Sequence, residues 1–142
     1  MNKLSLILAF MAFSFLSNAQ KITDGTWYNE EKDGKISFYM EGDKLNGKIV
    51  WLERPTENGK PRLDVNNSKS TLKTKPLMGL VFLKDFEKKD DKTWEEGTIY
   101  DPKTGKTYSS TISIVNGNRL DIRGFVGFSL LGRTTVFTRA SK

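Results

Sequence analysis

The sequence predicts an all-β domain, an antiparallel up-and-down barrel of about eight strands. Short runs of apolar or alternating residues recur about every eight to twelve positions, with turn residues between them. No segment after residue 19 has the period of an amphipathic helix. About eight sequential strands are the number that closes a small barrel and removes its free edges. A two-sheet sandwich is the alternative, and only the long connection at 53–75 would allow its crossing connections.

Residues 1–19 have the three regions of a secretory signal peptide. Lys3 supplies a positive start, 4–16 is almost entirely apolar, and small residues ending in Ala19 occupy the cleavage position. The apolar run is too short for a stable membrane-spanning helix, and no stop-transfer pattern follows it. The sequence therefore predicts cleavage after Ala19, a single domain of residues 20–142 without a transmembrane anchor, and a periplasmic or secreted location.

The composition excludes several classes of chemistry. The chain has no cysteine and no histidine, which removes disulfides, thiol nucleophiles, the usual transition-metal ligands and every histidine-dependent catalytic arrangement. Loss of Lys3 with the signal peptide lowers the formal net charge from +6 to +5. Basic and acidic residues are interleaved, as on a solvated surface. We therefore expect no cofactor, no metal site, no nucleic-acid partner and no enzymatic activity.

Alternating or continuous apolar residues mark each strand in turn. In 36–40 and 108–115 the apolar side chains recur at every second position, which is typical of a half-buried strand. The same alternation in 45–51 predicts that Trp51 shares a face with Ile49. The strands are expected near 26–28, 36–40, 45–51, 77–83, 94–100, 108–115, 119–125 and 133–139.

A long connection separates the third and fourth predicted strands. Residues 53–75 are rich in Pro, Asn, Ser and Lys and carry little apolar content. Loops of this length in compact domains are uncommon, and they are usually functional or mobile. The run 77–83 is apolar at every position except Gly79, so we expect a strand covered on both faces, with the long loop across it.

Turn residues mark two later hairpins. Asp101-Pro102 followed by Gly105 is typical of a turn in which the aspartate accepts hydrogen bonds from nearby backbone N–H groups. Asn116-Gly117 between two alternating runs indicates a tight hairpin.

The two ends of the domain resemble the lipocalin and wider calycin pattern. Gly25-x-Trp27 opens the first strand and Arg139 closes the last. In an even-stranded meander the last strand runs antiparallel to the first, so the guanidinium of Arg139 is expected to stack on the indole of Trp27 and close the barrel floor. The resemblance implies a lipocalin-like barrel.

A second resemblance covers most of the domain. The chain is similar to an exported bacterial family catalogued as a domain of unknown function, number twenty-one forty-seven, and this resemblance implies a calycin-like barrel, export and no established activity. Lysines replace family arginines at 73 and 75, and a lysine lacks the bidentate fork of an arginine. The segments that carry the resemblance are Lys75-Pro76-Leu77-Met78-Gly79-Leu80, Gly97 to Tyr108, Leu120 to Gly127, and Leu131 to Arg139.

Six residues are candidate ligand contacts. Arg123 and Arg133 lie near glycine-flanked strand ends, where two cations could hold a carboxylate or phosphate group. The structural alternative pairs each arginine with a nearby carboxylate such as Asp121. Four aromatic residues could line an apolar pocket, or could instead fill the barrel core; these are Tyr100, Tyr108, Trp51 and Trp94.

The sequence thus predicts an exported barrel that binds a small hydrophobic or amphipathic molecule. The alternative is a module without a ligand, located in the cell envelope, that contacts a protein partner through its surface and the 53–75 loop. An enzyme dependent on carboxylate or tyrosine groups is the third possibility. These classes differ in the interior: a binder needs a cavity of ligand size, whereas an interaction module can have a filled core.

Overall fold

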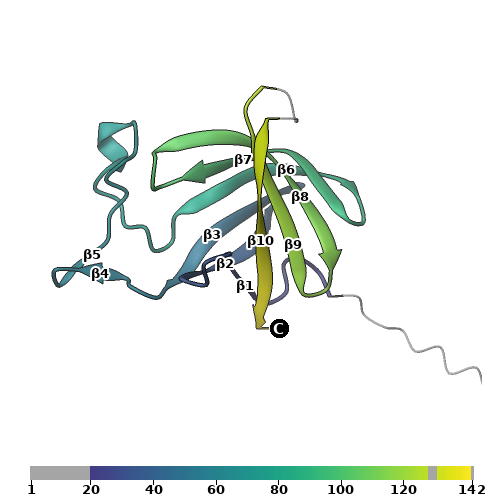
Figure 1. Ribbon diagram of the computed structural model, residues 1–142, viewed down its shortest axis with the longest axis horizontal. Coiled ribbons are helices and arrows are strands. Elements are labelled where there is room, and N and C mark those ends of the chain that lie inside the picture. The colour runs from purple at the N-terminus through teal and green to yellow at the C-terminus, as the bar shows by residue number, and fades with distance from the viewer. Residues whose placement is uncertain (1–19, 128–130, 142) are drawn as a thin grey trace, which may run out of the picture.

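The computed structural model describes residues 20–127 and 131–141, and within them the chain forms a closed antiparallel barrel (Figure 1). The predicted signal peptide at 1–19 lies outside the described residues. The barrel strands are β1 (Thr26–Tyr28), β2 (Gly34–Glu41), β3 (Lys44–Leu52), β6 (Val81–Asp90), β7 (Thr93–Asp101), β8 (Lys106–Asn116), β9 (Arg119–Phe125) and β10 (Gly132–Ser141).

The predicted eight-stranded meander is confirmed. Each barrel strand pairs antiparallel with the next one along the chain, and β10 returns to pair with β1. Only the β4–β5 hairpin, which forms its own small sheet between β3 and β6, interrupts the sequential order. Among the described residues, no helix has the length and apolar content needed to cross a membrane.

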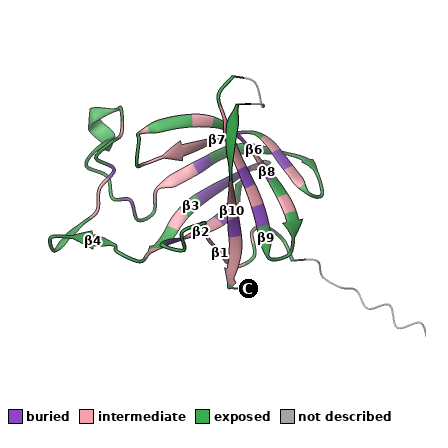
Figure 2. Cartoon of the chain, viewed as in Figure 1, coloured by how far each residue is buried: buried purple, intermediate pink, exposed green. Residues whose placement is uncertain are grey.

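Alternation along the strands places one row of side chains inside the barrel. In β2, Ile36 and Phe38 are buried while Lys35 and Ser37 are less so, as period-two alternation requires. Figure 2 shows the buried segments running as bands along the strands. The buried core comprises Ile22, Trp27, Ile36, Phe38, Leu45, Leu83, Phe86, Trp94, Ile112, Leu120, Ile122 and Phe137.

The prediction of a strand at 77–83 covered on both faces is wrong. Strand β6 begins at Val81, runs on through charged residues to Asp90, and buries only Leu83 and Phe86. These two residues are three positions apart because Asp85 has a positive φ of 64° and its N–H donates to the Asn46 side chain. Such a bulge shifts the alternation by one residue.

A second bulge shapes the neighbouring strand. Glu96 has a φ of 61°, and the pairing of β7 with β8 shifts between Trp94 and Gly97. A Cβ at Gly97 would lie only 2.4 Å from the Phe86 ring. The glycine therefore allows the phenyl ring to lie against the β7 backbone and fill the barrel interior.

The connection between β3 and β6 is an ordered lobe of residues 53–80. It contains the strands β4 (Thr56–Glu57) and β5 (Lys60–Pro61) and the short 3-10 helix η1 (Ser70–Leu72). Backbone hydrogen bonds cross its base, from Asp64 N–H to the Lys75 carbonyl and from Leu77 N–H to the Arg62 carbonyl. Leu77 is 8% exposed, but it precedes β6 and is not part of the buried cluster inside the barrel.

The sequence predicted that this segment lies across the 77–83 run. In the structure the lobe instead packs on the β7–β8 turn. The Asn66 side-chain amide donates to the carbonyls of Pro102 and Lys103, at 3.1 Å each. Gly105, with a φ of 73°, lies so close to the lobe that an added Cβ would be 1.9 Å from the Asn66 carbonyl oxygen. A side chain at position 105 would therefore push the lobe away.

The opposite end of the barrel is closed. Trp27 is fully buried and its indole N–H donates to the Ile22 carbonyl at 2.9 Å. The guanidinium carbon of Arg139 lies 4.1 Å from the centre of the Trp27 ring. Its nitrogens donate to the carbonyls of Gly117, Asp24 and Lys21. This cluster ties both ends of the domain to the β8–β9 turn.

Candidate ligand cavity

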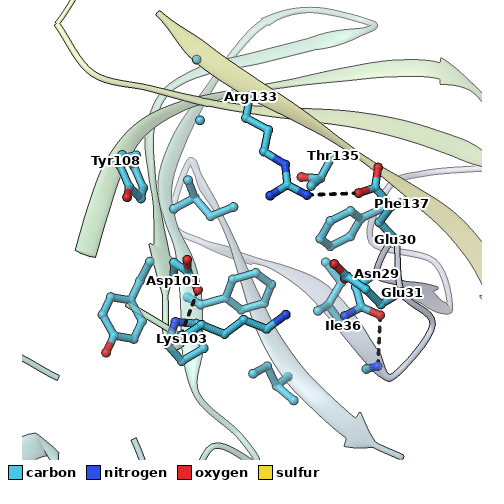
Figure 3. A pocket seen from close by; sticks show the side chains of 18 of the residues that line it. Asn29, Glu30, Glu31, Ile36, Asp101, Lys103, Tyr108, Arg133, Thr135 and Phe137 are labelled. Atoms are coloured by element: carbon cyan, nitrogen blue, oxygen red, sulfur yellow. Dashed lines mark hydrogen bonds and ion pairs between the residues drawn. The ribbon is translucent and has the colours of Figure 1, made fainter. Parts of the chain in front are cut away.

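A cavity of about 540 Å³ occupies the barrel end away from Trp27. Its walls come from β2, β3, β6, β7, β8, β9 and β10, so residues distant in sequence converge on one space (Figure 3). The volume is within the range of about 300–1,000 Å³ that is typical of small-molecule sites. The apolar side chains of the wall are Ile36, Ile49, Leu52, Phe82, Ile99, Phe125 and Phe137.

Small residues on β9 leave room for this cavity. Gly124 lies on the wall, and a Cβ there would already be 3.2 Å from Ile99. Two residues deeper along the same strand, Ile122 is fully buried. The barrel therefore changes from hollow to filled within one alternation of β9.

Charged side chains surround the mouth of the cavity. Arg133 points inward from β10, and its nearest anionic partner is Glu30 at 3.5 Å (Figure 3). Lys103 extends from the β7–β8 turn, and no ion pair of its amine is found among the described residues. Glu31 and Asp101 also lie at the mouth. The mouth is polar while the wall is apolar.

Two of the three carboxylates at the mouth, those of Glu30 and Asp101, are engaged by the protein itself. Glu30 accepts a hydrogen bond from the Val136 N–H at 3.3 Å in addition to its pair with Arg133. Asp101 accepts from the Lys103 N–H at 2.9 Å and from the Thr104 hydroxyl at 3.2 Å. The capped turn expected at Asp101 is therefore confirmed. In contrast, the donors of Lys103 and the exposed Arg133 retain capacity for a further acceptor.

Tyr100 connects the cavity wall to the lobe. Its ring lines the cavity, while its hydroxyl donates to the Asp64 carboxylate at 2.7 Å. Asp64 is 1% exposed, and its other oxygen accepts from the Asn67 amide at 2.8 Å. Burial, followed by the hydrogen bond to Asp64, raises the pKa of Tyr100 to about 12. The hydroxyl is thus committed to the lobe, and only the ring faces the cavity.

The structure brings three of the six candidate ligand contacts together. Arg133, Tyr100 and Tyr108 line the cavity. Trp94 is 7% exposed and belongs to the filled core. Arg123 pairs across strands with Thr111 and Thr134 on the outer face of β9, because the inward positions of that strand are Leu120 and Ile122.

Trp51 lies on the outside of the barrel, contrary to the predicted alternation. The β2–β3 pairing shifts between Lys35 and Ile36, so that Ile36 faces Ile49 while Lys35 faces Trp51. The extra residue, Val50, turns Trp51 outward, where it meets Tyr28 edge to face at 6.2 Å between ring centres. The Lys35 amine lies 5.0 Å from the Trp51 ring. The indole is thus part of an exterior cluster.

Sequence reasoning missed Lys103 and Asp64. Lys103 is a turn residue, and nothing in a single sequence says that this turn stands at a cavity mouth. Asp64 lies in the 53–75 segment, which was predicted to be a long functional or mobile loop. Its signal was weak but present: the carboxylate lies among the Asn residues at 66 and 67, which favour local hydrogen bonding.

A closed eight-stranded antiparallel barrel, filled at one end and open at the other, is a lipocalin-like fold. The chain belongs to the bacterial family described as "uncharacterized protein conserved in bacteria", domain of unknown function 2147, whose model matches residues 25–139. The family resemblance drawn from the sequence is therefore confirmed.

Two solved structures are similar to this chain. Protein HP1028 from Helicobacter pylori, described as belonging to the lipocalin family, aligns with a TM-score of 0.73 and 21% identity over 86% of this chain and 84% of that chain. A redesigned β-barrel aligns with a TM-score of 0.44 and 14% identity over 85% of this chain and 93% of that chain. No curated protein matches the chain. At this level of identity, the likeness to HP1028 shows the fold alone.

Proposed function

We propose that this protein is an exported binding protein for a small amphipathic molecule, held with its apolar part inside the barrel and an anionic group at the mouth. The observation that carries the proposal is the cavity of about 540 Å³ with apolar walls and a charged rim. Burial of apolar surface would supply affinity at about 25 cal/mol per Å².

The anionic head group follows from the partners of the rim residues. Glu30 and Asp101 already accept hydrogen bonds from the protein. Lys103 has no ion pair among the described residues, and Arg133 has only its pair with Glu30. A carboxylate or phosphate between these two cations would receive charge-assisted hydrogen bonds, which are the stronger kind.

Binding is favoured over the two rival functions. An interaction module without a ligand can fill its barrel completely, whereas this barrel leaves one end hollow. Catalysis has little to act through, because the chain lacks histidine and cysteine and the Asp64 carboxylate is buried beneath Tyr100. We therefore propose a carrier and not an enzyme.

The cavity is tested by filling it. We expect Ile99→Trp, which adds a large side chain to the wall, to lower the affinity for a fluorescent fatty acid at least tenfold by occupying ligand volume. The matched control is Val115→Trp, which adds the same side chain at a position that is 44% exposed on β8. Equal affinity in both variants, together with no bound mass in native mass spectrometry of the wild-type protein, would refute the binding function.

The rim is tested separately by charge. Replacing Arg133 and Lys103 with Gln is expected to weaken binding of a carboxylate-headed amphiphile by about ten- to a hundredfold, since hydrogen bonds to charged groups contribute about 1.5–3 kcal/mol. Binding of the corresponding alcohol should change little. Arg119→Gln, at the closed end of the barrel, serves as the control. Equal losses for the acid and the alcohol would show that the rim does not select anions.

A further inference from the structure

The lobe carries a basic surface that faces solvent. Residues 65–78, which we call the lysine segment, contain three lysines and no acidic residue. Lys69, Lys73 and Lys75 are all exposed, and the structure assigns none of them an ion pair within the described residues. Elsewhere the half-buried Lys44 and the exposed Lys88 and Lys89 are paired with carboxylates. The segment is therefore a local excess of uncompensated positive charge.

Exposed apolar side chains are interspersed with these lysines. Val65 is 60% exposed, Met78 41% and Leu72 36%, and Leu72 lies in η1 between Lys69 and Lys73. A surface that combines lysines with exposed aliphatic side chains has the two features that bind a protein to an anionic bilayer, namely charge attraction and shallow apolar insertion.

The lysine segment is held in place relative to the barrel. Asp64 precedes it and accepts a hydrogen bond from Tyr100, while Asn66 donates to the β7–β8 turn. Leu77, near its end, is buried in the lobe. Ordering this surface in advance removes part of the entropic cost of binding a flat partner.

This surface adjoins the cavity mouth. Tyr100, Pro102 and Lys103 line the cavity, and the same three residues receive hydrogen bonds from or donate them to the lobe. In Figure 1, η1 lies at the side of the molecule away from the C-terminus. A partner bound to the lysine segment would therefore lie beside the entrance.

We infer that the lysine segment docks this protein on a bilayer of anionic phospholipids. Lysines suit this partner because each is a flexible, strongly hydrated point charge that does not require fixed bidentate geometry. The docking itself does not depend on the cavity. Its use, loading or unloading an amphiphile at the membrane, rests on the function proposed above.

Vesicle flotation tests the inference with the chain from Gln20 on, which contains every barrel strand. We expect binding to vesicles of phosphatidylcholine with phosphatidylglycerol, none to phosphatidylcholine alone, and weakening with salt. The triple variant K69Q/K73Q/K75Q should lose on the order of a hundredfold in partition coefficient, given the contribution of each lysine near a charged surface. The matched control K88Q/K89Q/K92Q removes the same charge from the β6–β7 hairpin and should retain binding.

Three outcomes would overturn the docking inference. These are no flotation of the wild-type protein with anionic vesicles, undiminished flotation of K69Q/K73Q/K75Q, and equal loss in the K88Q/K89Q/K92Q control. Because all six lysines are exposed, we expect every variant to fold. A cooperative thermal unfolding transition of each variant checks this. Ile99→Trp keeps the two proposals apart, because it should lower amphiphile affinity at least tenfold and leave flotation unchanged.

Discussion

The side chain of Tyr100 contacts both the cavity and the lobe. Its ring contributes to the cavity wall, and its hydroxyl is the hydrogen-bond donor that satisfies buried Asp64. A buried carboxylate without such donors would be costly. The residue therefore couples the position of the lobe to the shape of the cavity, and a change at Asp64 would reach the wall through Tyr100.

The Tyr100 hydroxyl is predicted to lower the stability of the folded protein at alkaline pH. Its pKa is raised from 10.0 to about 12, first by burial and then by the hydrogen bond to Asp64. Between these values the folded chain retains a proton that the unfolded chain releases, so stability falls as the pH rises from 10 to about 12. We expect Tyr100→Phe to show a shallower loss than wild type in urea unfolding over this range.

Tyr108→Phe is the control for this alkaline loss. Tyr108 lines the same cavity, but its hydroxyl is not bonded to Asp64. Absorbance of tyrosinate should show the late titration of Tyr100 in wild type and in Tyr108→Phe, and this titration should be missing in Tyr100→Phe. A wild-type slope equal to that of Tyr100→Phe would contradict the proposed coupling.

The lobe lies tightly against the β7–β8 turn at Gly105, which makes their contact testable at the level of elements. Gly105→Ala should be strongly destabilising, because its Cβ would lie 1.9 Å from the Asn66 carbonyl oxygen and its φ is 73°. Gly42→Ala has a similar φ of 61° with nothing within 4 Å. We expect a loss of about 1 kcal/mol at Gly42 from backbone strain alone and about 3 kcal/mol or more at Gly105.

Hydrogen exchange locates where the Gly105 effect acts. In Gly105→Ala the lobe amides of Asp64 and Leu77 should exchange faster, while amides in the centre of β8 and β9 keep their protection. If Gly105→Ala and Gly42→Ala lose equal stability, the close contact contributes nothing and the lobe rests on the barrel by other means.

The strands with regular alternation could be predicted from the sequence, and those with bulges could not. Alternation in β2 and β8 placed Ile36, Phe38 and Ile112 correctly inside. In β6 the positive φ at Asp85 makes the two buried residues, Leu83 and Phe86, lie three positions apart instead of two. The rest of the strand is mostly charged, so its sequence shows no alternation with a period of two. The shift at Val50 similarly placed Trp51 outside.

The candidate site was predictable only in part, for a related reason. The inward direction of Arg133 and Tyr108 follows from strand alternation, but their proximity to Lys103 depends on which turn lies at which barrel end. That information resides in the closure of β1 on β10 and in the packing of the lobe, which are contacts between distant residues. A single sequence carries no direct record of them.

The whole barrel divides stability and binding between its two ends. The closed end holds Trp27, Phe38, Phe86 and Trp94 in a filled core, where burial of large side chains contributes most to folding. The open end holds the cavity and its charged rim. Under the proposed function, the open end binds the ligand while the floor maintains the fold.

The segment just after the predicted cleavage site completes the floor, so its removal should affect folding and not binding. Residues 20–24 supply buried Ile22, the carbonyl that accepts from Trp27, and two carbonyls that accept from Arg139. We expect a chain that begins at Gly25 to be less stable than one that begins at Gln20 by about 3–5 kcal/mol in urea unfolding.

The Ile22→Ala variant removes the buried side chain of this segment but keeps its carbonyls. We expect it to lower the free energy of unfolding by about 2–3 kcal/mol, less than the full deletion does. At low urea, where both chains are folded, their affinity for the fluorescent fatty acid should be equal, because the cavity wall contains no residue of this segment. Equal stability of the two chains would mean that Trp27 and Arg139 close the floor without it. A large loss of affinity in the folded, shortened chain would instead mean that the floor and the cavity are coupled, contrary to the division described here.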